Sequence, residues 1–300
     1  MSNLPKINQL KNLRAIIQYG SIRAASQAVH QTQSAMTRSI QELEKTLGVT
    51  LLDRTARGAL LTDMGRLFEP RMNMVLNELE RAVDEIRQLE SAANGTVMFG
   101  CSHLPAFGIM PGLLKKFQER HPKAYLTVIE GQLSELLGSL RLGRMDFFIG
   151  IVTPDIALHE FSEEHLSVAK FCVFAHKDHP LAHCQSLLEL RDAKWYLPTA
   201  SAGFFNAIEQ VVFPGGKGPG CSVLYGDSTT IAEQLILTEG YLSVGPQLML
   251  ELPWLKDKLC QVNVKETLPN GNYSLIYRQQ QTLTPIAKLL INEIRHEFIK

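Results

Sequence analysis

The sequence has few of the features that mark exported, membrane-bound or disulfide-dependent proteins. Its five cysteines are odd in number and form no CxxC pair, so neither a disulfide framework nor a zinc ribbon is indicated. The N-terminal stretch MSNLPKINQLKN has no hydrophobic signal core, and no run of about eighteen apolar residues occurs. We therefore expect a protein of the reducing cytoplasm that has no membrane as a partner.

Motifs of catalysis and of tight cofactor binding are also missing. No GxSxG elbow, HExxH helix or supported pair of carboxylates occurs. The stretch PGGKGPG at 214–220 has the glycines of a phosphate loop without its GK[ST] ending, so a flexible connection is the better interpretation. A metal site is one interpretation of His176, His179 and His183 beside Cys184, but Pro180 interrupts the spacing, which favours surface histidines. We expect no enzymatic activity, no cofactor and no metal.

Charge is balanced over the whole chain but not along it. The formal net charge of the 300 residues is zero, whereas residues 1–61 hold eight lysines and arginines against three acidic residues, a net charge of +5. The remainder is therefore mildly acidic. A basic N-terminal module on an acidic body is typical of a protein whose first part binds an anionic partner.

The stretch from Thr32 to Gly48 has the pattern of a helix that packs on one side. Apolar residues recur at Met36, Ile40, Leu43 and Leu47, Thr32 can cap the helix start, and Gly48 can close its end. The opposite face carries Gln33, Ser34, Thr37, Arg38 and Gln41. These side chains can bind base edges or phosphates in a major groove, although a solvated surface helix has the same pattern.

The surrounding residues favour the DNA-binding interpretation. Two helical patterns precede this stretch, one with apolar residues from Ile7 to Ile17 and one over Ile22 to Val29, which Ser21 can cap. Together the three predict a helix-turn-helix. The following VTLLDRTARGALLTD predicts a β-hairpin, a wing, with Arg54 and Arg57 placed to contact phosphate or a minor groove.

A long helix with a coiled-coil seam is predicted over residues 62–92. Its apolar residues keep spacings of four and three, at Phe68, Met72, Val75, Leu79, Ala82, Ile86 and Leu89. A second copy of the helix would bury this seam, so dimerisation is expected. Pro70 removes one hydrogen bond from a helix interior, and we expect a kink or break between Arg66 and Pro70.

Beyond a glycine-ended hinge at residues 91–95, strands and helices alternate. Strands are expected at 96–100, 125–130, 146–152, 167–175, 195–197, 222–225, 242–244, 261–264 and 273–277. Helices are expected at 111–120, 135–142, 186–191, 205–213, 229–237 and from 285 onward. Such alternation predicts parallel βαβ units in an α/β fold of two subdomains, with a cleft for a small molecule between them.

Three segments of the sequence resemble those of a known protein family. The run GSIRAASQAVHQTQSAMTRSIQELEKTLGVTLLDRTARGALLTDMG resembles the winged helix-turn-helix of LysR-type transcriptional regulators, and EGQLSELLGSLRLGRMDFFIG and HKDHPLA resemble segments of the body of that family. The resemblance implies a periplasmic-binding-protein-like (type 2) effector domain of two subdomains and a linker-helix dimer, assembled into a homotetramer as a dimer of dimers. Ser34 stands where the family most often has proline, and Pro70 is a second departure.

The resemblance also assigns candidate site residues. DNA contacts fall to Gln33, Ser34, Thr37, Arg38, Gln41, Arg54 and Arg57. Effector contacts fall to residues at or near predicted strand ends, namely Ser102, Gln132, Gly150, Ser201, Phe204 and Asp227, and Cys101 and His103 are further candidates for the same cleft. Hydroxyls and free backbone N–H groups at such positions suit a ligand carboxylate, although helix capping is an equal alternative for any one of them.

We therefore predict a ligand-responsive, sequence-specific transcription regulator of a bacterial metabolic operon that senses a small carboxylate-bearing metabolite. The predicted domains are 1–61 (DNA-binding), 62–92 (linker helix) and 93–300 (effector-binding), the last divided into 93–163 with 268–300 and 164–267. Its expected partners are double-stranded promoter DNA, a small-molecule effector and further copies of itself, with RNA polymerase left open. The alternatives are a cytosolic solute-type binding protein without a transcriptional role and a cytosolic α/β enzyme.

Overall fold

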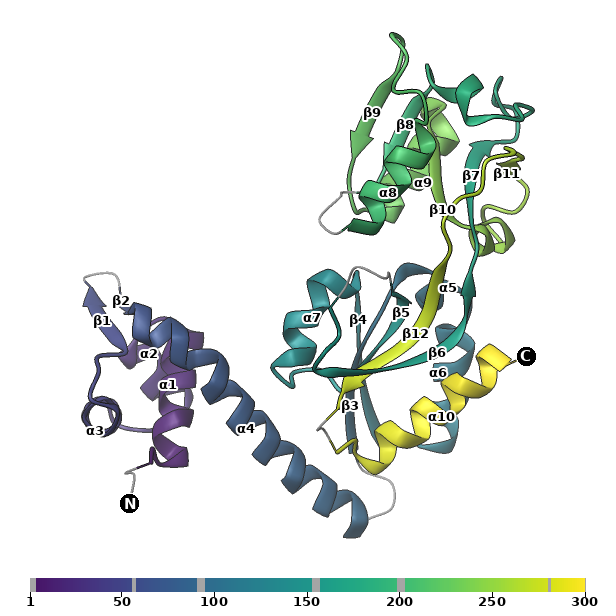
Figure 1. Cartoon of the computed structure of the whole chain (residues 1–300). Coiled ribbons are helices and arrows are strands. Elements are labelled where there is room, and N and C mark those ends of the chain that lie inside the picture. Colours follow the sequence, from purple (N-terminus) through teal and green to yellow (C-terminus); the bar gives the residue numbers. More distant parts are fainter. Residues whose placement is uncertain are drawn as a thin grey trace. The chain divides into compact units, whose positions relative to one another are not determined.

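The computed structural model describes residues 4–55, 58–90, 95–152, 157–198, 203–279 and 282–299. The chain forms two compact units, one of residues 1–92 with 141–144 and one of the remaining residues. Helices dominate the first unit, and two β-sheets form the centre of the second (Figure 1). Among the described residues, no helix is long and apolar enough to cross a membrane.

Three short helices begin the first unit and confirm the predicted helix-turn-helix. They are α1 Ile7–Tyr19, α2 Ile22–Ala28 and α3 Gln33–Leu47. Gly20 closes α1 in the left-handed conformation, and the Ser21 hydroxyl accepts the N–H of Ala24 at 3.1 Å to begin α2. His30, with a φ of 54°, makes the turn into α3. A polar side chain at this position is typical, because such residues tolerate the left-handed region better than branched ones.

The core of the first unit contains the apolar stripe that the sequence predicts for α3. Met36, Ile40 and Leu43 are buried together with Leu13 and Ile16 of α1. A side-chain hydrogen bond of 2.9 Å from Asn12 to Ser39 also joins α1 to α3. The packing fixes the rotation of α3 about its axis, so its opposite, polar face is directed away from the core.

The predicted wing is an antiparallel hairpin of β1 Leu52–Thr55 and β2 Gly58–Leu61. Glu44 of α3 holds its start, because its carboxylate accepts the N–H groups of Leu51 and Leu52 at 2.7 and 3.2 Å. Gly58 lies so close to the turn after α1 that a Cβ atom there would be 2.4 Å from the carbonyl oxygen of Gly20. Both contacts connect the wing to the helices that carry the DNA-binding candidates.

Of the predicted kink or break near Pro70, the break is wrong, because α4 runs without interruption from Asp63 to Glu90. Proline at this position removes the bond to the carbonyl of Arg66. Both residues are exposed, so water can hydrate that carbonyl. Packing of the buried Met72 and Leu76 against the helix-turn-helix core holds the turns on the C-terminal side of the proline in place.

The predicted seam of α4 divides into two parts. Phe68 and Met72 pack into the core of the first unit and are not available to a partner helix. Four exposed apolar side chains follow at spacings of four, four and three, namely Val75, Leu79, Val83 and Ile86. The part that a second helix can cover therefore begins near Val75.

Two five-stranded sheets organise the second unit. The first sheet has the order β4-β3-β5-β12-β6, with bounds Ala124–Glu130, Gly95–Cys101, Phe147–Val152, Gly271–Arg278 and Phe161–Ala169. The second has the order β11-β7-β10-β8-β9, with bounds Leu259–Val262, Phe171–His176, Leu242–Pro246, Lys194–Leu197 and Ser222–Tyr225. In each sheet two neighbouring pairs are parallel, as the predicted βαβ units require, and the other pairs are antiparallel.

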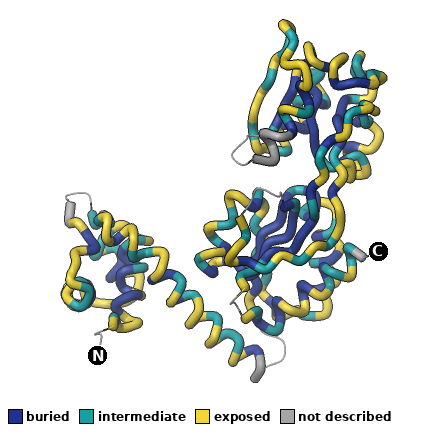
Figure 2. Tube along the Cα trace, viewed as in Figure 1, coloured by how far each residue is buried: buried dark blue, intermediate teal, exposed yellow. Residues whose placement is uncertain are grey.

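Each sheet has its own apolar core (Figure 2). The rings of Phe99 and Phe147 stack at 4.9 Å in the first sheet, and Trp195 in the second donates its ring N–H to the carbonyl of Leu190 at 3.1 Å. The helices are α5 His103–Gly108, α6 Met110–Arg120, α7 Leu133–Arg141, α8 Gly203–Val212, α9 Thr229–Glu239 and α10 Pro285–Ile299, with the 3₁₀-helices η1 Leu187–Leu190 and η2 Gln247–Glu251. Helix α5 was not predicted, and the helix expected at 186–191 is the short η1.

The strand predicted over residues 167–175 is in fact two strands in different sheets. β6 pairs with β12 in the first sheet, and after Lys170 the chain enters β7, which pairs with β10 and β11 in the second. The expected subdomain boundary between 163 and 164 falls inside β6. An apolar cluster that includes Tyr273, Cys172 and Phe174 lies where the chain changes sheets.

The glycine-rich stretch at 214–220 is held in place rather than left flexible. The Lys217 ammonium contacts Glu209 at 2.7 Å and the Tyr225 hydroxyl at 2.8 Å. Gly220 donates its N–H to Asp192 at 2.9 Å. The lysine therefore serves the local structure of the second sheet.

Candidate functional site

The polar face of α3 is the first candidate site. Gln33, Ser34, Arg38 and Gln41 are exposed, and Thr37 is half-buried. The Thr32 hydroxyl accepts the N–H of Ala35 at 3.2 Å and so caps the helix. All five predicted residues therefore come from one capped helix with its apolar side buried. A helix with this shape and chemistry can enter a major groove.

Ser34 is accommodated at the start of α3. Its hydroxyl lies 3.2 Å from that of Thr32, within hydrogen-bond distance, and α3 begins at Gln33 without irregularity. Serine also keeps a hydroxyl that can donate to phosphate or to a base, which proline would not have.

Arg38 is the one arginine on this face, and its side chain is 82% exposed. Its Nε donates to Glu42 at 3.1 Å, one turn further along α3. The bond does not occupy the two terminal nitrogens, which form bidentate contacts with guanine or phosphate. In the wing, Arg54 lies in β1, although its side chain is not described, and Arg57 lies outside the described residues.

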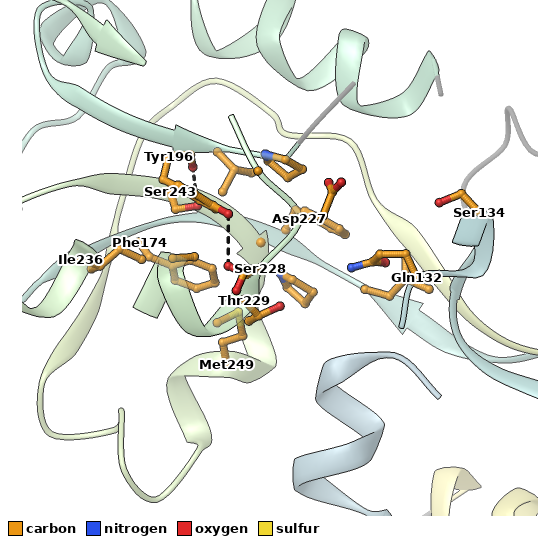
Figure 3. Close-up of a pocket in the computed structure, with 18 of the residues that line it drawn as sticks. Gln132, Ser134, Phe174, Tyr196, Asp227, Ser228, Thr229, Ile236, Ser243 and Met249 are labelled. Atoms are coloured by element: carbon orange, nitrogen blue, oxygen red, sulfur yellow. Dashed lines mark hydrogen bonds between the residues drawn. The ribbon is translucent and has the colours of Figure 1, made fainter. Parts of the chain in front are cut away.

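The second candidate site is a cavity of about 140 Å³ in the second unit (Figure 3). Its walls come from the ends of β8 and β10, the start of α9, and the start of α7. Apolar side chains form much of the lining: Ile151, Phe171, Phe174, Ile236, Val244 and Met249. Cavities that are mostly apolar with a few fixed polar groups are typical of small-molecule sites.

Polar groups of the cavity are held by hydrogen bonds. The Tyr196 hydroxyl donates to the carbonyl of Ser228 at 3.2 Å, and the Ser243 hydroxyl donates to the carbonyl of Tyr196 at 2.7 Å. The Ser228 hydroxyl in turn accepts the N–H of Ile231 at 3.3 Å as the cap of α9. Burial, and in smaller part the charge of Asp227, raises the pKa of Tyr196, so its hydroxyl stays protonated and can donate.

The predicted effector residues are only partly brought together. Gln132 and Asp227 both line the cavity, and Figure 3 shows them on the same side of Phe174 and Ile236. Ser102 and Gly150 are not among its lining residues. They lie against each other, since a Cβ on Gly150 would be 2.5 Å from the Ser102 hydroxyl oxygen. Ser201 lies outside the described residues, as does the side chain of Phe204.

A smaller polar chamber adjoins the cavity and contains Gln132 and Asp227, two of the predicted effector residues. It shares Gln132, Asp227, Ser228 and Thr229 with the cavity and adds His103, Glu130, Gly131, Glu135 and Thr230. His103 joins two elements of the unit, because its Nδ1 lies 2.9 Å from Glu130 and its Nε2 lies 3.2 Å from Glu233 of α9. A separation of 130 residues between His103 and Glu233 explains why local sequence patterns do not reveal this contact.

His103 is expected to stabilise the second unit in a pH-dependent way. Burial lowers the pKa of His103, but hydrogen bonds to Glu233 and Glu130 raise it by more, so its pKa lies above the ordinary value of 6.5. A raised pKa in the folded state means that the contribution is fully present below pH 6.5 and is lost as pH rises through the folded value. The variant His103→Gln should therefore lower the free energy of unfolding by about 1–3 kcal/mol at pH 6 and by less at pH 8.

Urea unfolding of both proteins at the two pH values tests this expectation. The exposed residue His159 provides the control variant His159→Gln, which should leave the free energy of unfolding unchanged. A loss in His103→Gln that is equal at pH 6 and pH 8 would contradict the assignment of a charged His103.

Together these features define a class of protein. A winged helix-turn-helix joined to a two-sheet α/β unit with a small-molecule cavity is the architecture of a ligand-responsive DNA-binding regulator. Residues 7–66 match the family model described as "Bacterial regulatory helix-turn-helix protein, lysR family", and residues 90–299 match the model "LysR substrate binding domain". The chain belongs to the LysR family of transcriptional regulators, which are not enzymes.

Known relatives and solved structures agree with this placement. The HTH-type transcriptional regulator TdcA of Escherichia coli is 30% identical over 295 residues, which cover 98% of this chain and 94% of TdcA. The HTH-type transcriptional regulator PcaQ of Agrobacterium fabrum is 27% identical and covers 70% of this chain and 68% of its own. The structure of full-length CbnR complexed with its target DNA is similar in fold, with a TM-score of 0.68, 21% identity, and coverage of 97% and 99% of the two chains.

Proposed function

We propose that the protein binds promoter DNA through α3 of two or more copies and that a small molecule in the cavity of the second unit changes this binding. The observation that carries the proposal is the polar face of α3, capped by Thr32 and presented by a basic module with a net charge of +5 over residues 1–61. Helices with amide, hydroxyl and guanidinium groups at their start bind base edges in the major groove.

Base contacts are assigned to Gln33, Ser34, Thr37, Arg38 and Gln41, and backbone contacts to Arg54 and Arg57 of the wing. Support comes from the first five residues sharing one helix and from the anchoring of the wing by Glu44 of that helix. Because one module offers few cations for phosphate, we propose that affinity depends on two or four modules binding together.

Effector contacts are assigned first to Gln132 and Asp227, which line the cavity. Ser102, Gly150, Ser201 and Phe204 remain proposed members of the site. For Ser102, support comes from its buried hydroxyl, which has no hydrogen-bond partner in the described part of the chain. Any ligand that shifts DNA affinity must bind the two states of the protein with different affinity. The ligand proposed is a small metabolite with a carboxylate, and the start of α9 offers N–H groups for it.

Assembly, boundaries and location are part of the same proposal. The exposed seam of α4 supports a dimer, and a dimer of dimers is proposed beyond it. The DNA-binding domain is proposed to cover 1–61, the linker helix 62–92 and the effector domain 93–300, with the change of subdomain near Lys170. The protein is proposed to act in the cytoplasm on the promoter of a metabolic operon, with RNA polymerase as a further partner.

A mobility-shift assay tests the function directly. The full-length protein is titrated against about 200 base pairs of DNA flanking its own gene and against a shuffled sequence of equal composition, both at a fixed salt concentration of about 150 mM. We expect a Kd of about 10⁻⁸ M or lower for the genomic DNA and binding at least about 10³-fold weaker for the shuffled DNA. Equal affinity for the two would contradict sequence-specific regulation and favour a solute-type binding protein.

A further inference from the structure

The cavity and the adjoining polar chamber together contain no lysine or arginine. None occurs among the described residues that line either space. The undescribed stretches 153–156 and 199–202, which follow the lining residues Ile151 and Pro198, contain none in their sequence either. Among the described lining residues, a ligand that is only an anion would therefore find His103 as its one cationic partner, and that ring already faces two carboxylates.

Carboxylates dominate the polar chamber. Glu130, Glu135 and Asp227 line it, and the carboxylate of Glu233 lies within hydrogen-bond distance of the His103 ring. His103 is the single basic side chain among the described residues that line the chamber, and its two ring nitrogens face Glu130 and Glu233. Because the described lining has more acidic than basic side chains, the chamber favours a positively charged group.

The two helix starts at the site differ in what they offer to an anion. At α7, the carboxylate of Glu135 already accepts the N–H of Gln132 at 3.1 Å. At α9, the Ser228 hydroxyl accepts the N–H of Ile231, whereas the N–H groups of Thr229 and Thr230 have no acceptor within the helix. Glu135 also places a negative charge in the first turn of α7, whereas the first turn of α9 has no acidic residue, so α9 is the better place for a ligand carboxylate.

The acidic group and the start of α9 lie close together along the chain. Asp227, Ser228 and Thr229 are consecutive residues and line both the cavity and the polar chamber. A small ligand that carries an ammonium and a carboxylate on one carbon atom matches this arrangement, with the ammonium beside Asp227 and the carboxylate at Thr229. The remaining part of such a ligand extends toward Phe174, Ile236 and Met249, which require an apolar group.

We propose that the effector is an α-amino acid with an apolar side chain. Its ammonium group binds Asp227 within the acidic chamber, its carboxylate binds the N–H groups at the start of α9, and its side chain fills the apolar cavity. This assignment rests on the proposed function, since it names the ligand to which the regulator responds. It also narrows the class of carboxylate-bearing metabolites to zwitterions.

Isothermal titration calorimetry on the full-length protein tests the ligand class. The probes are L-valine, L-leucine, L-isoleucine, L-methionine and L-phenylalanine, each with two matched analogues that lack only the ammonium or only the carboxylate. For L-leucine these analogues are 4-methylpentanoate and 3-methylbutylamine. At least one amino acid is expected to bind, and both of its analogues should bind at least tenfold more weakly. Binding of the deaminated analogue within threefold of its parent, or no binding by all five amino acids, would overturn the proposal.

The variant Asp227→Asn tests the contact assigned to the ammonium. It should lose at least tenfold in affinity for the amino acid while affinity for the deaminated analogue stays equal or rises. Glu119→Gln makes the same chemical change on the exposed surface of α6 and should leave both affinities unchanged. An equal loss for both ligands in Asp227→Asn would contradict the assignment.

DNA retention by the same preparations separates the two proposals. If the protein retains its genomic DNA specifically but binds none of the five amino acids, the ligand class is wrong and the regulator remains. If specific DNA retention is absent in the wild type, the proposed function itself fails, whatever the calorimetry gives.

Discussion

Replacement of Leu79 and Ile86 by aspartate is expected to turn the protein into a monomer and to abolish specific DNA retention. Val75, Leu79, Val83 and Ile86 are 50%, 42%, 41% and 59% exposed, although all four are apolar and follow one face of α4. Such a stripe on a 28-residue helix is the pattern of a coiled-coil seam that a second helix covers.

The expected size of the effect follows from the area that a dimer would bury. Each Leu or Ile side chain contributes about 1.5 kcal/mol or more on burial, and a dimer has four of the substituted positions. A loss of about 6 kcal/mol weakens association by about 10⁴-fold, before the cost of placing aspartates in an apolar interface is added. Because we propose that the DNA affinity depends on two modules binding together, the monomer should also lose specific retention.

Sedimentation equilibrium at micromolar concentration measures the expected change in mass, and the mobility-shift assay measures the loss of retention. Leu67→Asp provides the control, since Leu67 is an exposed apolar residue on α4 and lies about 120° around the helix from the centre of the seam. The control should keep the wild-type mass. A double variant that retains the mass of the wild-type oligomer would show that α4 is not the dimer interface.

The first unit could be predicted almost completely from the sequence because its determinants are local. Thr32, Met36 and Gly48 lie within one helix length, and cap, stripe and closing glycine all specify the same helix. The extent of the seam on α4 was harder to predict. Spacing alone cannot distinguish a residue that packs on its own unit, such as Met72, from one that remains exposed, such as Val75.

Long-range pairing explains the errors in the second unit. The run 167–175 has the composition of one strand, but the partners of β6 and β7 are β12 and β10, which come about 70 to 110 residues later and belong to different sheets. The candidate effector site likewise has residues that the sequence predicts and a contact that it does not. Gln132 and Asp227 follow from their places at strand ends, whereas the His103 to Glu233 contact depends on how two distant helices meet.

Substitution of Arg38 by alanine is the second change with a large expected effect. Arg38 is the arginine of the exposed α3 face, and its terminal nitrogens are not used in the bond to Glu42. A bidentate arginine contact to a base discriminates by about 1–3 kcal/mol, and two modules double this, so the Kd for genomic DNA should rise by about 30-fold to 10⁴-fold. Lys115→Ala removes one positive charge from the exposed surface of α6 and should leave the Kd unchanged.

The partner of Arg38 on DNA can be identified from the same titrations. If Arg38 binds a base, Arg38→Ala loses affinity for genomic DNA but little for shuffled DNA, so the specificity ratio falls. If it binds phosphate, affinity falls equally for both sequences, and the salt dependence of log K weakens by about one unit per module. We expect the first result, because Arg38 lies one turn after the capped start of α3, where side chains of a recognition helix contact base edges. Unchanged binding to both DNAs would remove α3 from the interface.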